Sequence, residues 1–274
     1  MARTRKYGEY NKVILPKLAC PNFIADTSHL REFAREHGFN GIDWSFTLGD
    51  FPDSPAAESD LMRSINSLEP LEIRYHCAFK KIDFGNIDEV EDEKAMTVFR
   101  RVCDLVAMLR GDTLTIHLGL GQENTNHLFW HRAIERLTEL VGFAHKRGIR
   151  LCLENLAWGW TSRPQQFEKF LRRTGCWATL DIGHARVSPS VVNRHYDLED
   201  FVLPHPNRFL NAHIYHEEIN DRHIPPETVK DIEDRLRLLY RLPRCDWWVV
   251  ELREESSLLQ TRNVVRTFMD GKFL

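Results

Sequence analysis

Short apolar runs alternate with longer segments in which apolar residues recur at helical spacing. The short runs predict eight strands, over residues 13–18, 41–46, 71–78, 113–118, 149–154, 177–181, 209–214 and 247–252. The longer segments predict seven helices, over residues 26–38, 56–68, 90–109, 128–146, 164–171, 226–240 and 256–269. Residues 187–206 are less regular, and we expect only a short helix within them.

Strands and helices alternate along the chain without a dividing linker. Parallel strands joined by helices form α/β folds, and eight βα units in about 250 residues are typical of a TIM barrel. We therefore predict one (β/α)8 TIM-barrel domain over residues 1–274, in which residues 1–12 form a polar N-terminal tail.

The strands themselves alternate between two kinds of residue. One set is apolar, as in Leu114 and Ile116 or Leu151 and Leu153, and would pack on the helices. The other set is small or polar and would line the barrel interior. Its members are Arg74, His76, Thr115, His117, Cys152, Glu154, Thr179, Asp181, Asn211, His213, Val249 and Glu251. The ionisable members cluster near the carboxyl ends of the strands, where the active sites of such barrels are found.

Composition narrows the class of protein. Apolar residues make up 42% of the chain and charged residues 28%, which is ordinary for a globular protein with a full core. A net charge of −3 disfavours a nucleic acid partner. The six cysteines do not have the spacing of a zinc finger. We therefore expect them to be buried free thiols of a protein in the reducing cytosol. Without a signal peptide or a run of about 18 apolar residues, we expect a cytoplasmic protein with no membrane attachment. The sequence is compatible with either a monomer or a homo-oligomer.

The inward face of strands three to eight carries a concentration of ionisable side chains. They are His76, His117, Glu154, Asp181, His213 and Glu251. Burying several carboxylates against one another is costly unless a cation or shared protons neutralise them. Two or three divalent metal ions would do so. Three further candidates follow strands six and seven in the sequence, namely His184, Asp221 and His223.

Five short motifs carry these residues. They are Leu-Glu-Asn (153–155), Leu-Asp-Ile-Gly-His (180–184), Ala-His-Ile (212–214), Asp-Arg-His (221–223) and Val-Glu-Leu (250–252). In this order they resemble the signatures of the xylose isomerase-like TIM-barrel superfamily. That superfamily holds sugar-phosphate isomerases, ketose 3-epimerases, inosose dehydratases and endonuclease IV-type AP endonucleases. The resemblance spans residues 71–252.

The resemblance implies a divalent metal site. Its ligands would be Glu154, Asp181, His213 and Glu251. Three carboxylates and one imidazole suit Mn²⁺, Mg²⁺, Co²⁺ or Zn²⁺. In the epimerase branch, the residues matching Glu154 and Glu251 also transfer protons on opposite faces of the substrate. The residue matching His184 then contacts substrate hydroxyls.

The endonuclease branch implies two further metal ions. His76 and His117 resemble ligands of a second zinc ion that shares Glu154. A third zinc ion would be held by His184, Asp221 and His223. In an enzyme with one metal ion, His76 and His117 would contact substrate instead. A Gly-rich segment that often follows Asp-x-His in the family is replaced here by residues 224–228, so a substrate loop is expected to differ.

Other side chains near the strand ends have a less specific interpretation. Asp43 ends strand two where relatives often carry Glu, which puts a substrate contact there in doubt. Trp158 and Trp160 would either stack on a sugar ring or pack between helices, and Arg253 would either bind a substrate phosphate or lie in solvent. Residues 216–218 (His-Glu-Glu) fall out of register with the barrel interior and are left out of the ligand set.

These observations favour a metal-dependent isomerase or epimerase of a small sugar, sugar phosphate or polyol. Proton transfer by Glu154 and Glu251 would pass through a metal-stabilised enediolate. One alternative is an endonuclease IV-like multi-zinc phosphodiesterase, which would need a basic groove as wide as DNA. Another alternative is a catalytically inactive ligand-binding barrel, which would hold no stoichiometric metal.

Overall fold

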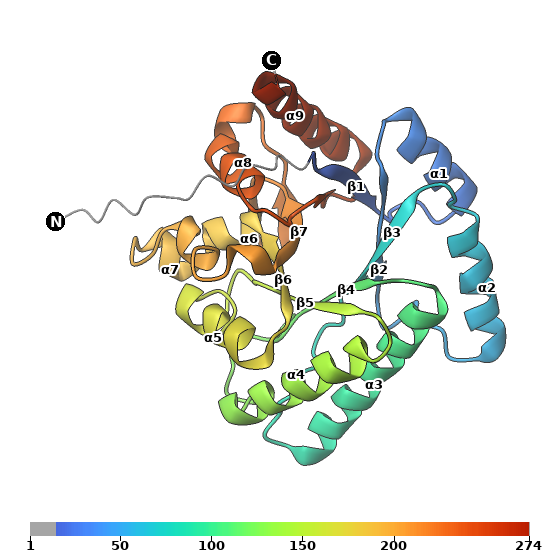
Figure 1. Cartoon of the computed structure of the whole chain (residues 1–274), viewed down its shortest axis with the longest axis vertical. Helices are drawn as coiled ribbons and strands as arrows, with labels where there is room; N and C mark the ends of the chain where they lie inside the picture. The colour runs from blue at the N-terminus through green and yellow to red at the C-terminus, as the bar shows by residue number, and fades with distance from the viewer. Residues whose placement is uncertain (1–14, 274) are drawn as a thin grey trace.

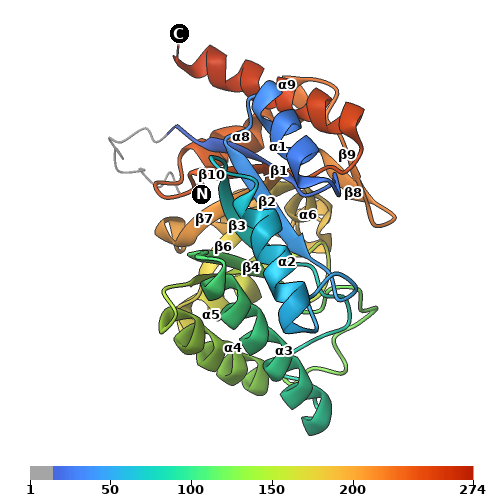
Figure 2. The ribbon, with the colours of Figure 1, turned by 90° about the vertical axis from the view of Figure 1, so that its right-hand side faces the viewer.

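The computed structural model describes residues 15–273 and confirms the predicted TIM barrel. Eight parallel strands close into a barrel in the order β1-β10-β7-β6-β5-β4-β3-β2. The strands are β1 (Lys17–Pro21), β2 (Gly41–Phe46), β3 (Glu72–Cys77), β4 (Thr113–Ile116), β5 (Arg150–Glu154), β6 (Trp177–Asp181), β7 (Phe209–Ile214) and β10 (Trp247–Val250). Figures 1 and 2 show the helices arranged around this ring of strands.

Long and short helices connect the strands. The α-helices are α1 (Thr27–Glu36), α2 (Pro55–Asn66), α3 (Glu89–Met108), α4 (Trp130–His145), α5 (Pro164–Thr174), α6 (Ile182–Val187), α7 (Pro189–Val192), α8 (Glu233–Tyr240) and α9 (Glu255–Phe273). Short 3-10 helices lie at η1 (Leu198–Phe201), η2 (Pro206–Arg208) and η3 (Val229–Asp231). Asp26, Ser54 and Asp88 each accept a backbone N–H from the first turn of the helix that follows, which explains where α1, α2 and α3 begin.

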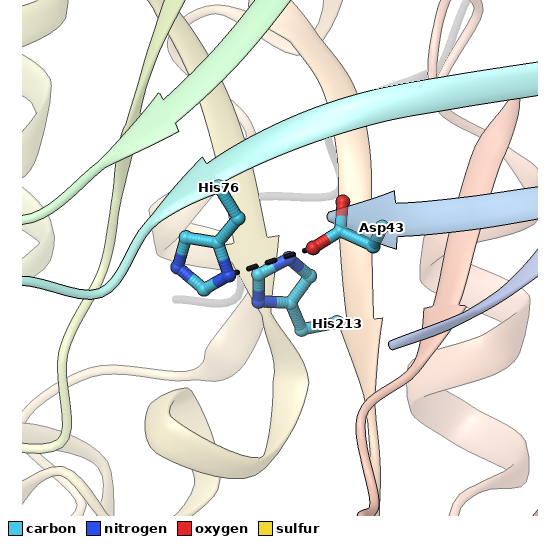
Figure 3. A group of neighbouring side chains, drawn as sticks. All are labelled: Asp43, His76 and His213. Carbon is cyan, nitrogen blue, oxygen red and sulfur yellow. Dashed lines mark ion pairs between the residues drawn. The ribbon is translucent and has the colours of Figure 1, made fainter. Parts of the chain in front are cut away.

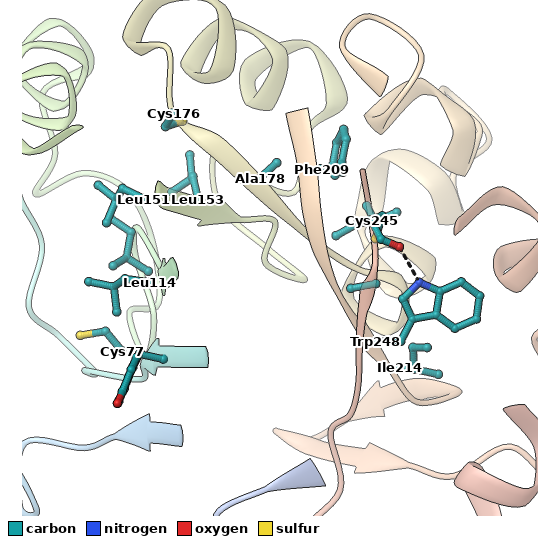
Figure 4. Close-up of a cluster of buried hydrophobic side chains, with 14 of the residues drawn as sticks. Cys77, Leu114, Leu151, Leu153, Cys176, Ala178, Phe209, Ile214, Cys245 and Trp248 are labelled. Carbon is teal, nitrogen blue, oxygen red and sulfur yellow. Dashed lines mark hydrogen bonds between the residues drawn. The ribbon is translucent and has the colours of Figure 1, made fainter. Parts of the chain in front are cut away.

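The apolar set of strand residues packs against the helices, as the alternation predicts. Figure 4 shows part of this layer. Its buried members include Leu114, Leu151, Leu153, Ala178, Phe209, Ile214 and Trp248. The indole N–H of Trp248 donates to the carbonyl of Cys245 at 3.1 Å, so the polar atom of this large side chain is satisfied. All six cysteines are buried and unpaired.

A network of polar and aromatic side chains fills the barrel interior near the amino ends of the strands. The guanidinium of Arg74 donates to Asn211 Oδ1 at 2.7 Å and to Asp246 Oδ1 at 2.9 Å. The same group lies 4.8 Å from the ring centroid of Trp247. Trp247 in turn packs on Gly41, where a Cβ would lie 2.4 Å from Cη2 of the indole. This end of the barrel is therefore closed.

Two predicted elements differ from the structure, and the short helix expected within residues 187–206 is present. The strand predicted over residues 13–18 is wrong at its start, because β1 begins at Lys17. Residues 13 and 14 lie outside the described part, and Pro16 has no N–H for the ladder. The helix predicted over residues 226–240 is wrong in its first half, because Asp231 accepts the backbone N–H of Thr228 and forms the separate 3-10 turn η3. The irregular region 187–206 contains α7 and η1.

The hairpin that follows β7 was not predicted from the sequence pattern. Its strands, β8 (Glu217–Ile219) and β9 (Arg222–Ile224), pair in antiparallel fashion beside α6 (Figure 2). Strands of three residues are too short to show a hydrophobic period. No helix within residues 15–273 combines the length and apolarity needed to cross a lipid bilayer.

Candidate metal centre

The ends of four strands bring three carboxylates and one imidazole to a single point in the barrel. Glu154 is the last residue of β5, Asp181 is the last residue of β6, and His213 lies in β7 directly opposite Asp181. Glu251 follows the last residue of β10. One ligand atom from each of the four residues can be chosen so that all lie within 4.8 Å of one another. The structure thus brings together the four residues predicted as ligands of one metal ion.

His213 lies at the middle of this group. Its Nδ1 is 3.1 Å from Glu154 Oε2, 3.3 Å from Glu251 Oε2 and 4.0 Å from Asp181 Oδ2. The side chains of Glu154, Asp181 and His213 are at most 1% exposed, whereas that of Glu251 is 18% exposed. The group is therefore shielded from water except on the side of Glu251.

Several buried polar atoms of this group lack a hydrogen-bond partner among the described residues. They are both carboxylate oxygens of Glu154, Asp181 Oδ2, Glu251 Oε2 and both ring nitrogens of His213. Buried polar groups are almost always paired, because an unpaired one costs about 1–3 kcal/mol, and more if it is charged. A divalent cation would satisfy these atoms together. Both the unpaired atoms and the oxygen-rich donor set fit a divalent metal ion.

Burial and neighbouring charges shift the pKa values of His213 and Glu154 in opposite directions. Burial lowers the pKa of His213, but Glu154 and Glu251 outweigh it and raise that pKa well above its ordinary value. Burial raises the pKa of Glu154, but His213 and His117 outweigh it and hold that pKa well below its ordinary value. For Asp181, burial raises the pKa to about 6. The carboxylates thus depend on nearby positive charge, which a metal ion would also provide.

Asn155 holds the backbone at Asp181 in place. Its side-chain oxygen accepts the N–H of Asp181 at 2.9 Å, and its side-chain N–H donates to the carbonyl of Asp181 at 2.9 Å. Asp181 Oδ1 also accepts the N–H of His184 at 2.7 Å, so Asp181 caps α6. Only Oδ2 is then left for another partner. Asn155 is the last residue of the Leu-Glu-Asn motif, but no role for it was predicted from the sequence.

A second group of donor atoms shares Glu154. The Nε2 atoms of His76 and His117 lie 3.2 Å apart, and they are 3.6 Å and 3.2 Å from Glu154 Oε2. Nδ1 of His117 is 3.2 Å from the carbonyl of Cys77, to which it can donate. The ligand atoms of this group also lie within 4.8 Å of one another. The structure therefore places His76 and His117 where the resemblance puts a second metal ion.

Asp43 lies behind His76. Figure 3 shows its carboxylate directed towards the two imidazoles of His76 and His213. Asp43 Oδ2 is 3.5 Å from His76 Nδ1, and both side chains are 3% exposed. Burial lowers the pKa of His76, but the hydrogen bond to Asp43 and the charge of Glu154 outweigh it and raise that pKa. Asp43 thus contacts a candidate ligand, a role that the sequence analysis did not assign.

The third group differs from the predicted one. It consists of His184, Glu218 and His223, and the ligand atoms lie within 4.8 Å of one another. Asp221 is not brought to it, because Asp221 is exposed at the turn between β8 and β9 with a φ of 57°. Glu218, which the sequence analysis had left out of the ligands, stands near His184 instead. The structure therefore does not bring Asp221 to the two histidines with which the resemblance grouped it.

Trp158 and Arg253 lie outside the three donor groups. Trp158 is half-buried against Gly119, where a Cβ would lie 3.6 Å from Cη2 of the indole. Arg253 is exposed two residues after Glu251. Trp160 packs edge-on against Trp130 and tilted against Phe170, which agrees with the helix-packing interpretation. Substrate contact by Trp158 and Arg253 stays a prediction.

The chain belongs to the xylose isomerase-like TIM-barrel family, whose model matches residues 31–268. It is 27% identical to the uncharacterized protein MJ0008 of Methanocaldococcus jannaschii over 168 residues, which cover 61% of this chain and 71% of that protein. The family predicted from the five motifs is therefore confirmed.

Solved structures with the same fold include sugar epimerases and an endonuclease. A D-tagatose 3-epimerase-like protein has a TM-score of 0.71 at 16% identity, covering 93% of this chain and 97% of its own. An L-ribulose 3-epimerase has a TM-score of 0.68 at 15% identity, covering 93% and 94%. Endonuclease IV from Thermus thermophilus has a TM-score of 0.65 at 16% identity, covering 93% and 100%. At these identities the likeness establishes the fold.

Proposed function

We propose that the protein is a metal-dependent isomerase or epimerase of a small sugar, sugar phosphate or polyol. The observation that carries this proposal is the convergence of Glu154 and Glu251 on one atom. Their Oε2 atoms lie 3.1 Å and 3.3 Å from Nδ1 of His213. Each of these oxygens lacks a hydrogen-bond partner among residues 15–273. Two such carboxylates at one point suit a reaction in which one takes a proton and the other returns it.

Each of the four central residues would have a defined task. Together, Glu154, Asp181, His213 and Glu251 would hold a divalent cation, which supplies Lewis-acid chemistry by polarising a substrate carbonyl. Glu154 would accept the proton from the carbon beside that carbonyl, and Glu251 would return a proton from the other face of the substrate. The near-complete burial of Glu154 supports this task, because the attraction between a base and the reacting group is stronger where water is excluded.

His184 would orient the substrate. Its ring stands at the edge of the central group, with Nδ1 3.2 Å from Asp181 Oδ2 and 3.5 Å from Glu154 Oε1. Its Nε2 lies 2.9 Å from Glu218 Oε2, and by exchanging this partner for a substrate hydroxyl it would fix the reacting carbon near Glu154. The proposal for His184 follows the epimerase branch of the family.

Solvent isotope exchange tests the proposal without knowledge of the true substrate. The protein is loaded with Mn²⁺, Mg²⁺, Co²⁺ or Zn²⁺ in turn and incubated in D2O with a panel of ketoses, aldoses and their phosphates. We expect proton NMR to show deuterium entering the carbon next to the carbonyl of at least one sugar. Absence of exchange for the whole panel with every metal ion would contradict the proposal.

Glu154→Gln is the decisive variant. It keeps the size of the side chain but removes the base, and we expect exchange to fall by about 10²–10⁴-fold. Glu123→Gln is the matched control, because Glu123 is exposed in the loop after β4 and its loss should leave exchange unchanged. Full exchange in Glu154→Gln would rule out the assigned mechanism.

A second candidate function is hydrolysis of a phosphodiester by a metal cluster. The observation that favours it is the second donor group of His76, His117 and Glu154, because metal pairs of this kind activate water and stabilise the leaving oxygen. The exposed side chains that follow the strand ends carry both positive and negative charges, as in Lys80, Arg253 and Glu254. This mixture of charges does not favour a groove that binds DNA. Cleavage of a duplex with an abasic site, without sugar exchange, would support this second function.

A further inference from the structure

Residues of α6, α7, η1, β8, η3 and α8 line a cavity of about 530 Å³ among the elements that surround the barrel. Figure 1 shows α6, α7 and α8 on the outside of the ring of strands. No residue of the three donor groups lines this cavity. A cavity of this size can hold a small organic molecule, so it is a candidate site for a second ligand.

The lining contains a buried positive charge that has no carboxylate partner. Arg235 is 7% exposed, and its two terminal amino groups donate to the carbonyls of Ile182, His216 and Asp231 and to Nδ1 of His216. None of these acceptors carries a charge. Within residues 15–273, the guanidinium forms no ion pair with a carboxylate, and its Nε–H has no hydrogen-bond acceptor. A buried charge without a counter-charge is costly, so an anion in the cavity would stabilise this side chain.

Further positive charge lies close to Arg235. Burial and the neighbouring charge of Arg186 lower the pKa of Arg235 to about 10, which still leaves the side chain positively charged at neutral pH. Lys230 also lines the cavity, is exposed, and forms no ion pair within the described part of the chain. A negatively charged group would therefore meet two uncompensated cations here, Arg235 and Lys230.

The acidic side chains of the lining are largely engaged elsewhere. Glu217 Oε2 lies 3.2 Å from Nε of Arg186, and Asp231 Oδ2 accepts the backbone N–H of Thr228 at 2.7 Å. The third acid, Asp234, is exposed to solvent. Because three cations and three acids line the cavity, their formal charges cancel. A ligand with one negative charge is therefore favoured over one with two.

The remaining lining of the cavity is aliphatic. It consists of Val187, Val191, Val192, Leu198 and Ile232. Val192 is 63% exposed, so a ligand can reach this wall from solvent. Carbon groups that pack on such a surface leave water, which favours binding. The ligand that satisfies both walls has a single carboxylate and a short branched chain.

We propose that this cavity binds a small branched aliphatic carboxylate, which acts as an effector of the metal centre. The carboxylate group would pair with Arg235 and Lys230, and the branched chain would pack on Val187, Val191 and Val192. Binding at this cavity does not depend on the isomerase activity proposed above.

Arg235 connects the cavity to the metal centre. Ile182, whose carbonyl accepts from Arg235 at 3.3 Å, directly follows the candidate ligand Asp181. A carboxylate that engages the guanidinium therefore acts on the backbone next to Asp181. Coupling of this kind is reciprocal, so the carboxylate and the metal ion would change each other's affinity by the same factor. The effector role rests on the metal centre proposed above, whereas the binding of the carboxylate does not.

Calorimetric titration of the chelator-treated full chain with sodium isovalerate tests the binding. We expect one equivalent to bind, about tenfold or more tightly than acetate, which has the same charge without the branched chain. Val192→Asp, which adds a negative charge to the aliphatic wall, should weaken isovalerate binding by about tenfold or more. Val90→Asp is the matched control, because Val192 and Val90 are 63% and 62% exposed.

Two further variants test the cations. Arg235→Gln is expected to abolish isovalerate binding. If it does not fold, Lys230→Gln replaces it and should weaken binding about two- to fivefold, because Lys230 is exposed. Lys146→Gln, at another exposed lysine, should bind as the wild type does.

Three results would overturn the binding site. They are the absence of isovalerate binding, equal affinity in the wild type and Val192→Asp, and acetate binding as tight as that of isovalerate. For the effector role, Zn²⁺ affinity is measured with and without saturating isovalerate, and we expect a change of about fivefold or more that Val192→Asp lacks. Unchanged Zn²⁺ affinity would overturn the effector role. Absence of Zn²⁺ binding would instead contradict the metal centre, and the isovalerate titration would still report on the cavity.

Discussion

At the scale of single residues, Asp43 and Ser45 both face Nδ1 of His76. Asp43 Oδ2 lies 3.5 Å and Ser45 Oγ 3.4 Å from this nitrogen, and a carboxylate beside a ligating histidine favours the hydrogen on the nitrogen that faces it. The other nitrogen, Nε2, is then left to face His117 and Glu154. Asp43 stands where relatives often carry Glu, and its shorter side chain contacts His76.

Asp43→Asn is expected to weaken metal binding at the group of His76, His117 and Glu154. Carboxylates that orient a ligating histidine typically contribute about 10–100-fold to metal affinity. Calorimetric titration with Zn²⁺ would measure the change, and Asp53→Asn, which alters an exposed side chain, is the control. Equal affinity in Asp43→Asn and the wild type would show that Asp43 does not orient His76.

The predicted site residues that the structure brings together are those whose positions follow from strand periodicity. Glu154, Asp181 and His213 lie on or at the end of strands, where alternation places every second side chain inside the barrel. Asp221 and Glu218 lie in a hairpin, where the orientation of a side chain depends on the turn. The Asp-Arg-His motif does not encode a positive φ, so it could not show which acid faces His184.

At the scale of elements, the same hairpin is the part of the site that the sequence could not predict. The neighbouring residues Asn220 and Asp221 are the only signal for it, because they favour a two-residue turn. The eight barrel strands could be predicted because each is bounded by helical segments that are themselves clear. A strand of three residues needs the completed barrel beside it in order to be stable.

Substitutions at Asp221 should show how much the turn between β8 and β9 contributes to stability. Asp221→Gly is expected to keep the stability of the protein, because Gly adopts a positive φ readily. Asp221→Val should destabilise the protein by about 1–2 kcal/mol, because a β-branched side chain resists that conformation. Thermal unfolding by circular dichroism measures both variants. A stable Asp221→Val would mean that the turn does not have the backbone described above.

At the scale of the whole molecule, the central group ties together strands that are far apart in the sequence. Glu154, Asp181, His213 and Glu251 come from β5, β6, β7 and the residue after β10. A bound cation would therefore link four of the eight barrel strands, and it would satisfy several buried polar atoms that have no hydrogen-bond partner among residues 15–273. We therefore expect metal binding to stabilise the folded barrel, because only the folded barrel brings the four ligands together.

Removal of metal is expected to lower the melting temperature. Free ligand at 100 times its dissociation constant contributes about 2.7 kcal/mol to stability, which corresponds to several degrees in a domain of this size. Unfolding would be followed with and without a chelator, and then after Zn²⁺ or Mn²⁺ is added back. Glu154→Gln should show a smaller difference between the two states. An unchanged melting temperature in the wild type would contradict a cation in the central group.

The closed end of the barrel has a kinetic consequence. Arg74, Asn211 and Trp247 are at most 5% exposed and block the amino end of the interior, so within residues 15–273 the centre opens towards the carboxyl ends of the strands, on the side of Glu251. A cation held beneath a substrate would then share its route with that substrate. We expect loading in a fixed order, with the metal ion first and the substrate second, and release of the ion only after the substrate has left.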